Sequence, residues 1–376
     1  MSFYTDINIT EENSSQPEFS PNANDWGEGM LEVLDSEKQS RRWVEAKIKS
    51  FDPETEYAEI VSLMAQYQLD EFTLNFLVTI LTSYTLKPSH MAETLSITNK
   101  GLRRPNQRMQ DTLDFFWIWH VHGPDSEETK KSLSRLNKLH AGVARMLPGH
   151  FENGDDFIYV LGRLFVLQDR LLKDLNMVGM DPHIKLALFN FARALSKHFR
   201  TEGNKPIKGF PNTPEALEAF VNDWESKNHG YSPVSRDIVN SFVHAFGDRW
   251  FPHPFKPLGR WVCIEALEDS FLEHVRIKPL NGIRKLLARG ALKSLFFYKT
   301  RIAADRKISA YDERVLLSKK ECARMDERAV KRVSKFGWTK GGRDSVGLGD
   351  GPSLAGKCPV MSPTQTSSEV KRPVSN

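Results

Sequence analysis

The sequence predicts an all-α protein built as a single large helical bundle. Apolar residues recur at three- and four-residue spacing along most of the chain, which is the period of one helix face, while strand-like alternation is nearly absent. Several of these stretches begin with a capping residue followed by proline, a common helix start. With 376 residues, 23 Phe and 8 Trp, the chain can bury one sizeable core. We therefore expect an all-α domain over residues 30–335, between a disordered N-terminal segment (1–29) and a flexible C-terminal tail (336–376).

The helices expected in the first part of the chain follow from apolar spacing interrupted by polar turns. Ile60 and Leu63 lie one turn apart on one side of their helix, and 70–82 is apolar enough to be buried on most sides. The turn His122-Gly123-Pro124-Asp125 separates two long helices, with Asp125 or Ser126 as the cap of the second. The predicted helices cover residues 41–48, 56–66, 70–82, 88–98, 108–121 and 126–146.

The helices of the second part begin at clearer signals. Residues 155–175 are apolar around most of the helix and are expected at the centre of the bundle. Asp181 and Thr213 are each followed by proline, the pattern of a cap and first turn. The predicted helices cover residues 155–175, 181–199, 213–226, 232–246, 258–275, 280–297 and 309–334.

Composition narrows the class of protein. The three cysteines (Cys263, Cys322 and Cys358) are far apart and form no CxxC pair, which argues against a disulfide framework and a zinc–cysteine site. The sequence has no apolar run of eighteen residues that would predict a transmembrane segment, and its acidic, polar start is unlike a secretory signal. We therefore expect a cytoplasmic protein.

Positive charge is concentrated in residues 276–343, which contain 20 Lys or Arg and 6 Asp or Glu. Within this region, 283–297 combines leucines with Arg284, Lys285, Arg289 and Lys293, a pattern that suits peripheral contact with an anionic membrane. An ordinary bundle helix with a solvated basic face is the alternative. No nucleic-acid-binding motif accompanies the charge, so nucleic acid is not an expected partner.

Histidines are the candidate metal ligands, because the sequence contains no GxSxG, HExxH or P-loop motif and no Glu-x-x-His pairs of a di-iron bundle. A histidine on an apolar helix face is usually a core residue. His140, between Leu139 and Ala141, lies at the border of such a face, and His244 is its best rival. His120 and His122 are expected near the turn, as solvent-side or turn-stabilising residues.

The stretch 108–140 carries a family resemblance. It combines Arg-x-x-x-Thr on an aromatic-rich helix with Arg-Leu-Asn-Lys-Leu-His-Ala-Gly-Val on the next helix. In this it resembles the MpaB and latex-clearing-protein (rubber oxygenase) family of heme-dependent oxygenases. In that family, the arginine and threonine lie on a helix of the heme pocket and the histidine is the axial iron ligand. The matching residues here are Arg108, Thr112 and His140, and the implied fold has a distantly globin-like core.

The resemblance implies a function. It implies a heme b enzyme that uses O₂ to attack a small apolar, unsaturated substrate, isoprenoid- or lipid-like, with cleavage of a C=C bond. Glu93 corresponds to a glutamate proposed as the catalytic base, while Arg108 and Thr112 act at the heme or at bound oxygen. Asp111 stands where the latex-clearing branch has an iron-capping lysine, which favours a more open distal side and counts against rubber-like substrates. Arg163 or Arg170 could reach a heme propionate, or be ordinary solvated charges.

Two alternatives remain at this stage. The chain could be a non-enzymatic helical protein whose apolar pocket binds a lipid or a partner helix. It could also be a heme protein without oxygenase activity.

Overall fold

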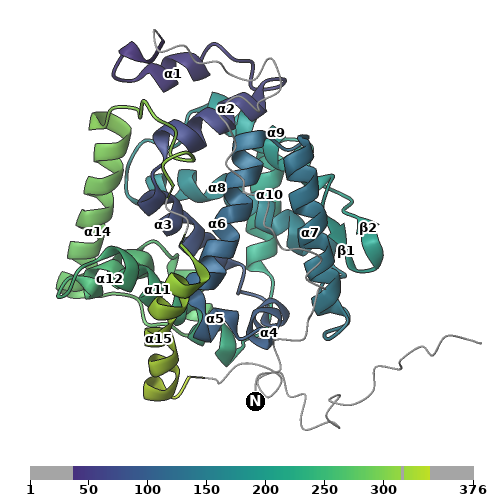
Figure 1. Ribbon diagram of the computed structural model, residues 1–376, viewed down its shortest axis with the longest axis vertical. Coiled ribbons are helices and arrows are strands. Elements are labelled where there is room, and N and C mark those ends of the chain that lie inside the picture. Colours follow the sequence, from purple (N-terminus) through teal and green to yellow (C-terminus); the bar gives the residue numbers. More distant parts are fainter. Residues whose placement is uncertain (1–36, 315–316, 339–376) are drawn as a thin grey trace, which may run out of the picture.

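The computed structural model describes residues 37–314 and 317–338, and this part of the chain is almost entirely helical (Figure 1). The predicted all-α class is therefore confirmed. The likeness to a globin core stays a prediction. The α-helices are α1 (Trp43–Ile48), α2 (Tyr57–Leu63), α3 (Glu71–Tyr84), α4 (Ser89–Ile97), α5 (Lys100–Arg103), α6 (Pro105–His122), α7 (Glu127–Ala144), α8 (Gly154–Asp174), α9 (Pro182–Ser196), α10 (Pro214–Ser226), α11 (Pro233–Trp250), α12 (Lys256–Glu265), α13 (Asp269–His274), α14 (Gly282–Phe297) and α15 (Lys319–Phe336).

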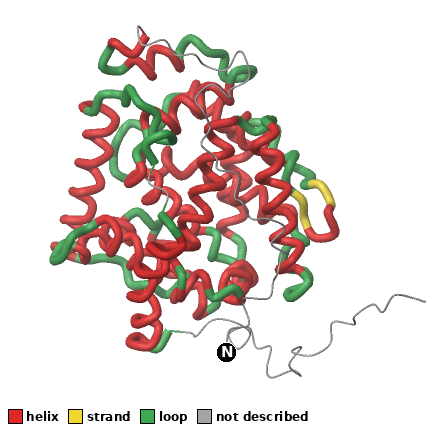
Figure 2. The backbone as a smooth tube through the Cα atoms, in the orientation of Figure 1, coloured by secondary structure: helices red, strands yellow, loops and turns green. Residues whose placement is uncertain are grey.

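Short irregular elements complete the described part. Strands β1 (Arg200–Thr201) and β2 (Lys205–Pro206) pair antiparallel and form a small hairpin at the edge of the molecule (Figure 2). The sequence pattern did not predict this hairpin, because two-residue strands are too short to show an alternation. The remaining elements are the 3₁₀-helices η1 (Glu37–Gln39) and η3 (Glu202–Asn204) and the π-helical segments η2 (Met64–Gln68) and η4 (Tyr298–Ile302).

Helix α8 occupies the centre of the bundle, as its sequence predicted (Figure 1). It packs against α3, α9 and α10, and 13 of its 21 residues are buried, so apolar contacts surround most of the helix. The main apolar core lies beside it and includes side chains of α3, α6, α11 and α12. The central helix thus lies between two regions of the molecule, one at α6–α7 and one at α12–α14.

The hairpin of α6 and α7 has the predicted form. Gly123 ends α6 with a φ of 80°, a conformation that glycine adopts without steric cost. The Ser126 hydroxyl accepts a hydrogen bond from the Thr129 amide at 3.1 Å and so caps α7. Trp119 Nε1 donates to Ser132 Oγ at 3.1 Å, which ties the two helices together. These contacts fix how α6 and α7 present their side chains to each other.

Two predicted helices were wrong in extent. The stretch 258–275 is split, because the chain breaks at Glu268, whose amide donates to the Tyr84 hydroxyl at 2.8 Å. The stretch 309–334 is not helical at its start. There Ser309 and Ala310 bind Gln66, and the helix begins only after Ser318, which forms a capping box with Glu321. Tertiary contacts override the helical spacing at both places.

In the part of the chain that the structure describes, no helix is both long enough and apolar enough to span a membrane. The predicted tails, 1–29 and 336–376, lie outside the described residues, except that α15 continues to Phe336 and two further residues follow it.

Candidate functional site

His140 lies one turn before the end of α7 and packs against aromatic rings. The Phe151 ring stacks on its imidazole with centroids 4.6 Å apart, and Phe157 meets it edge-on at 5.8 Å. Burial and then the charge of Arg108 lower the pKa of His140 to about 4. The imidazole is therefore neutral at pH 7, the form that can bind a metal.

The ring nitrogens of His140 lack partners among the described residues. Its Nδ1 atom is buried without a hydrogen bond, and no hydrogen bond is formed by Nε2. Buried polar atoms nearly always have a partner, so an exception calls for an explanation, and an absent ligand is one such explanation. His140 thus keeps the predicted features of a ligand: it is neutral, surrounded by apolar groups and not used by the fold.

Arg108 and Thr112 lie one turn apart on α6, as predicted, and they contact each other. The Arg108 guanidinium donates to the Thr112 hydroxyl, which itself donates to the Arg108 backbone carbonyl at 2.9 Å. Burial lowers the pKa of Arg108, and the neighbouring Asp111 carboxylate only partly offsets this. No ion pair of Arg108 with a carboxylate is present within the described ranges. Asp111 instead binds Lys100 at 2.7 Å and Gln107 at 2.8 Å.

Arg108 and His140 lie on the packed helices α6 and α7, and the charge of Arg108 contributes to the lowered pKa of His140. A partly buried arginine that lacks a counterion is costly, because desolvation is not offset by an opposite charge. A group that carries negative charge and also offers a place for an imidazole ligand would satisfy both residues. The arrangement therefore has the chemical requirements of a site for a metal-bearing anion.

Glu93, on α4, does not contact Arg108 or His140 directly. Its Oε2 lies 3.7 Å from His150 Nε2, and His150 precedes Phe151, the residue stacked on His140. The His90 carbonyl and the Thr94 hydroxyl each lie 3.1 Å from His150 Nδ1. Glu93 thus has a histidine neighbour that the sequence had not indicated.

The loop between α7 and α8 is the part of the site that sequence reasoning missed. His150 and Phe151 both belong to it, and neither follows a helical period. Their one sequence signal is an aromatic pair, His-Phe, in an otherwise polar turn (Pro-Gly-His-Phe-Glu-Asn-Gly) directly after the His140 helix.

The other histidines are engaged differently. His120 is buried, not on the solvent side as predicted. Its ring stacks on Phe116 at 3.6 Å, its Nδ1 bonds the Phe116 carbonyl at 2.8 Å, and burial lowers its pKa to about 4. His244, the rival ligand, faces Arg260, whose guanidinium lies 3.1 Å from its Nδ1. Burial, followed by Arg260 and Arg332, lowers the pKa of His244 to about 3, and a cation in that position leaves it poorly placed to bind a metal cation.

Phe116 and His120 also line a small apolar cavity of about 70 Å³ between α2, α3, α6 and α8. It begins one helical turn along α6 from Thr112. The α6 side chains at positions 108, 112, 116 and 120 are spaced by four residues and lie along one side of the helix. The polar pair and the apolar cavity therefore follow each other along the same helix.

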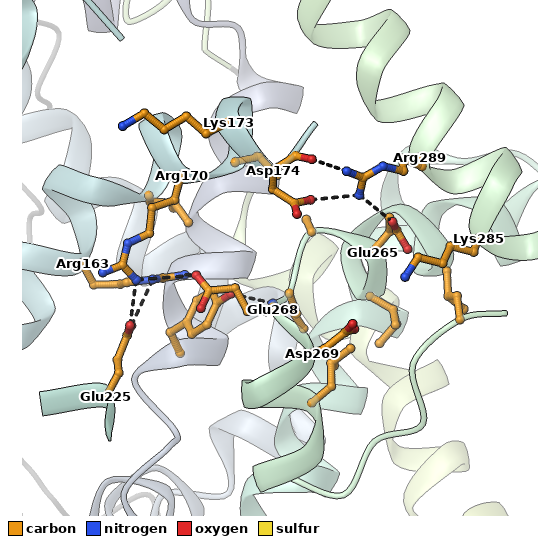
Figure 3. A pocket seen from close by; sticks show the side chains of 18 of the residues that line it. Arg163, Arg170, Lys173, Asp174, Glu225, Glu265, Glu268, Asp269, Lys285 and Arg289 are labelled. Carbon is orange, nitrogen blue, oxygen red and sulfur yellow. Dashed lines mark hydrogen bonds and ion pairs between the residues drawn. The ribbon is translucent and has the colours of Figure 1, made fainter. Parts of the chain in front are cut away.

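A second, larger cavity of about 450 Å³ is lined by residues of α8, α10 and the segment from α12 to α13, and it is charged (Figure 3). Arg163 is 1% exposed and binds Glu225 and Glu268, each at 3.0 Å. Arg170 binds the same two carboxylates. Neither arginine is therefore an ordinary solvated charge, and neither is free for a heme propionate. Ion pairs of these two arginines with Glu225 and Glu268 form part of the lining of this cavity.

No family model matches the sequence, and no curated protein matches it significantly. The resemblance to the MpaB and latex-clearing-protein family thus stays a prediction carried by Arg108, Thr112 and His140.

Proposed function

We propose that the protein is a heme b-dependent oxygenase that acts with O₂ on a small apolar, unsaturated substrate, isoprenoid- or lipid-like, by oxidative cleavage of a C=C bond. The observation that carries this proposal is that two residues with unmet requirements lie on the packed helices α6 and α7. His140 is neutral and has a buried nitrogen without a partner, and Arg108 is a partly buried cation without a carboxylate partner among the described residues. Heme needs a nitrogen ligand, apolar walls and a cation or donor for its propionates.

The residues of this site have distinct roles in the proposal. His140 would ligate the iron, while Phe151 and Phe157 supply apolar surface beside it. Arg108 and Thr112 would donate hydrogen bonds to a propionate or to oxygen-borne negative charge, where a positioned donor stabilises developing charge. Heme, when bound, supplies the iron at which O₂ reacts. The small cavity beside Phe116 offers an apolar surface for part of the substrate.

Glu93 would act as the base that removes a proton from a carbon next to the double bond. Its neighbour His150 supports this role, because the Nε2 atom of its ring lies 3.7 Å from Glu93 Oε2, beside the group that would receive the proton.

The absorption spectrum of the purified protein tests the cofactor. We expect a Soret band after expression or after addition of hemin, with about one heme per chain, and its loss or strong shift in His140→Ala. The matched controls are His120→Ala and His244→Ala, which remove buried histidines elsewhere and should keep the band. Protein that stays colourless after hemin addition would overturn the proposal and leave the non-enzymatic lipid- or partner-binding alternative.

Oxygen consumption separates the remaining alternative, a heme protein without oxygenase activity. We expect O₂ uptake with apolar alkenes that depends on both the heme and the alkene. A protein with an intact Soret band and no uptake with any unsaturated isoprenoid or lipid would be a heme protein of another kind.

The proposal also includes a location. We place the enzyme in the cytoplasm with peripheral contact to a membrane, because apolar substrates accumulate in lipid. Nucleic acid has no part in it.

A further inference from the structure

Exposed large apolar side chains gather on one segment of the surface. Twelve such residues occur in the described part of the chain, and seven of them fall between positions 283 and 308. Single exposed apolar residues are common on protein surfaces, but a contiguous group marks an interaction site. The seven are Ile283 (65% exposed), Leu286 (68%), Leu287 (49%), Phe297 (52%), Tyr298 (52%), Ile302 (43%) and Ile308 (58%).

Helix α14 carries most of this group and has apolar side chains on two opposite sides. Its inner side, with Ala288, Leu292 and Phe296, is buried and packs mainly on α12. Ile283, Leu286, Leu287 and Phe297 recur at intervals of three, four and fourteen residues and therefore share the outer side. We call these four residues the outer stripe. The helix runs along the edge of the molecule, so the outer stripe faces away from the bundle (Figure 1).

The charges on α14 are of one sign. The helix has four basic residues and no acidic one. Arg289 turns inward and binds Asp174 at 3.0 Å and Glu265 at 3.1 Å (Figure 3). Arg284 and Lys293 are exposed and flank the outer stripe, one on either side by helical spacing. The sequence showed leucines and cations together in 283–297, and the structure places two of these cations beside an outward apolar stripe.

We propose that the outer stripe of α14 docks the protein on an anionic lipid surface, with the apolar side chains entering the headgroup region and Arg284 and Lys293 contacting lipid phosphates or carboxylates. Apolar residues on one side of a helix and flanking cations are what an interfacial helix requires. A second copy of the chain is a poor occupant, because two basic stripes would repel each other.

This inference does not depend on heme. It deepens the proposed function, because a membrane is the phase in which an apolar substrate would be found. Its test uses lipid alone, so the lipid-docking proposal can fail while the heme proposal stands. The heme proposal can likewise fail while lipid docking is observed.

Vesicle sedimentation with the full-length protein tests the proposal. We expect binding at low salt to vesicles of equal parts phosphatidylcholine and phosphatidylserine, and much weaker binding to pure phosphatidylcholine. Leu286→Gln with Leu287→Gln should weaken the binding by about 10-fold or more, because two apolar side chains no longer enter the lipid. Arg284→Gln with Lys293→Gln should also weaken it by about 10-fold, and raising the salt to about 1 M should abolish the charge contribution.

The matched control is Val178→Gln with Phe255→Gln, which removes two exposed apolar residues elsewhere (75% and 59% exposed) and should leave binding unchanged. A tryptophan in the stripe, Leu286→Trp, should show a blue shift of its fluorescence with anionic vesicles only. Equal binding to both vesicle types, or binding that the Leu286/Leu287 variant retains, would overturn the proposal. Self-association that this variant abolishes would assign the stripe to a second copy, and an acidic protein that displaces the vesicles from it would assign it to a protein partner.

Discussion

Arg163 is buried in the helical bundle and Arg108 is partly buried in it, and their surroundings are opposite. Arg163 binds two carboxylates and also lies 3.5 Å from the centre of the Tyr84 ring. Burial alone would lower its pKa, but Tyr84, Glu268 and Glu225 outweigh burial and raise it. Arg108 has a hydroxyl as its hydrogen-bond partner, and burial lowers its pKa. One arginine has carboxylate counterions, and the other has none among the described residues.

The presence or absence of a counterion distinguishes polar groups with a structural role from those with a functional role. A buried ion pair whose members satisfy each other can be explained by the fold alone, whereas a buried charge without a counterion costs stability and calls for another reason. The large charged cavity around Arg163 (Figure 3) is therefore the less informative of the two regions, although it offers more space. The region of Arg108 and His140 is the one in which a ligand would remove a cost.

The largest expected effect is on stability, and it contrasts the two arginines directly. Arg163→Met should lower the free energy of unfolding by about 3–5 kcal/mol, because Glu225 and Glu268 are left without their cation. Arg108→Met should change it by less than about 1 kcal/mol or raise it, because no carboxylate loses a partner. Urea unfolding of heme-free protein measures both. Equal destabilisation by the two substitutions would show that the counterions of Arg163 do not set it apart from Arg108.

A smaller effect concerns turnover at the proposed base. Glu93→Gln should keep the heme spectrum and reduce turnover by about 100-fold or more, the usual contribution of a positioned base. Arg108→Ala should also reduce turnover and, unlike Glu93→Gln, should weaken heme binding as well. Steady-state O₂ consumption and hemin titration measure the two properties separately. Full activity of Glu93→Gln on a confirmed substrate would refute the base assignment and leave the heme assignment intact.

The smallest effect is a dependence of stability on pH. Folding lowers the pKa of His140 from its usual value near 6.5 to about 4, so the folded protein binds fewer protons than the unfolded chain between these values. The contribution of this histidine to the free energy of unfolding is therefore fully present above pH 6.5. It is lost as the pH falls toward 4, at up to about 1.4 kcal/mol per pH unit. Between these pH values, His140→Leu should reduce the slope of the free energy of unfolding against pH by about this amount.

His120 provides the comparison for this experiment, because its pKa is also lowered to about 4. His120→Leu should flatten the curve similarly, yet only His140→Leu should abolish heme binding. Urea unfolding of heme-free protein at several pH values gives the slopes, and a curve unchanged by His140→Leu would show that this ring is not neutral and buried in solution.

Much of the fold could be predicted from local pattern. The α6–α7 hairpin, its turn at Gly123 and its Ser126 cap follow from residues within a few positions of one another. Failures occurred where distant residues intervene, as at Glu268, whose amide binds Tyr84 and interrupts an otherwise continuous helical period. The burial of His120 was missed for the same reason, since Phe191 on α9 helps to enclose it.

The sequence by itself determined the all-α class, the central place of α8 and the one-turn spacing of Arg108 and Thr112, because helical periodicity and i,i+4 neighbours are local properties. Only the tertiary structure decided which buried charges have counterions, since the partners of Arg163 lie more than sixty residues away along the chain. Tertiary packing also decided that His140 keeps unpartnered nitrogens, that Glu93 meets His150, and that the apolar stripe of α14 faces outward. These properties depend on which surfaces meet, and a helix with two apolar sides does not specify in its own sequence which of them the bundle will cover.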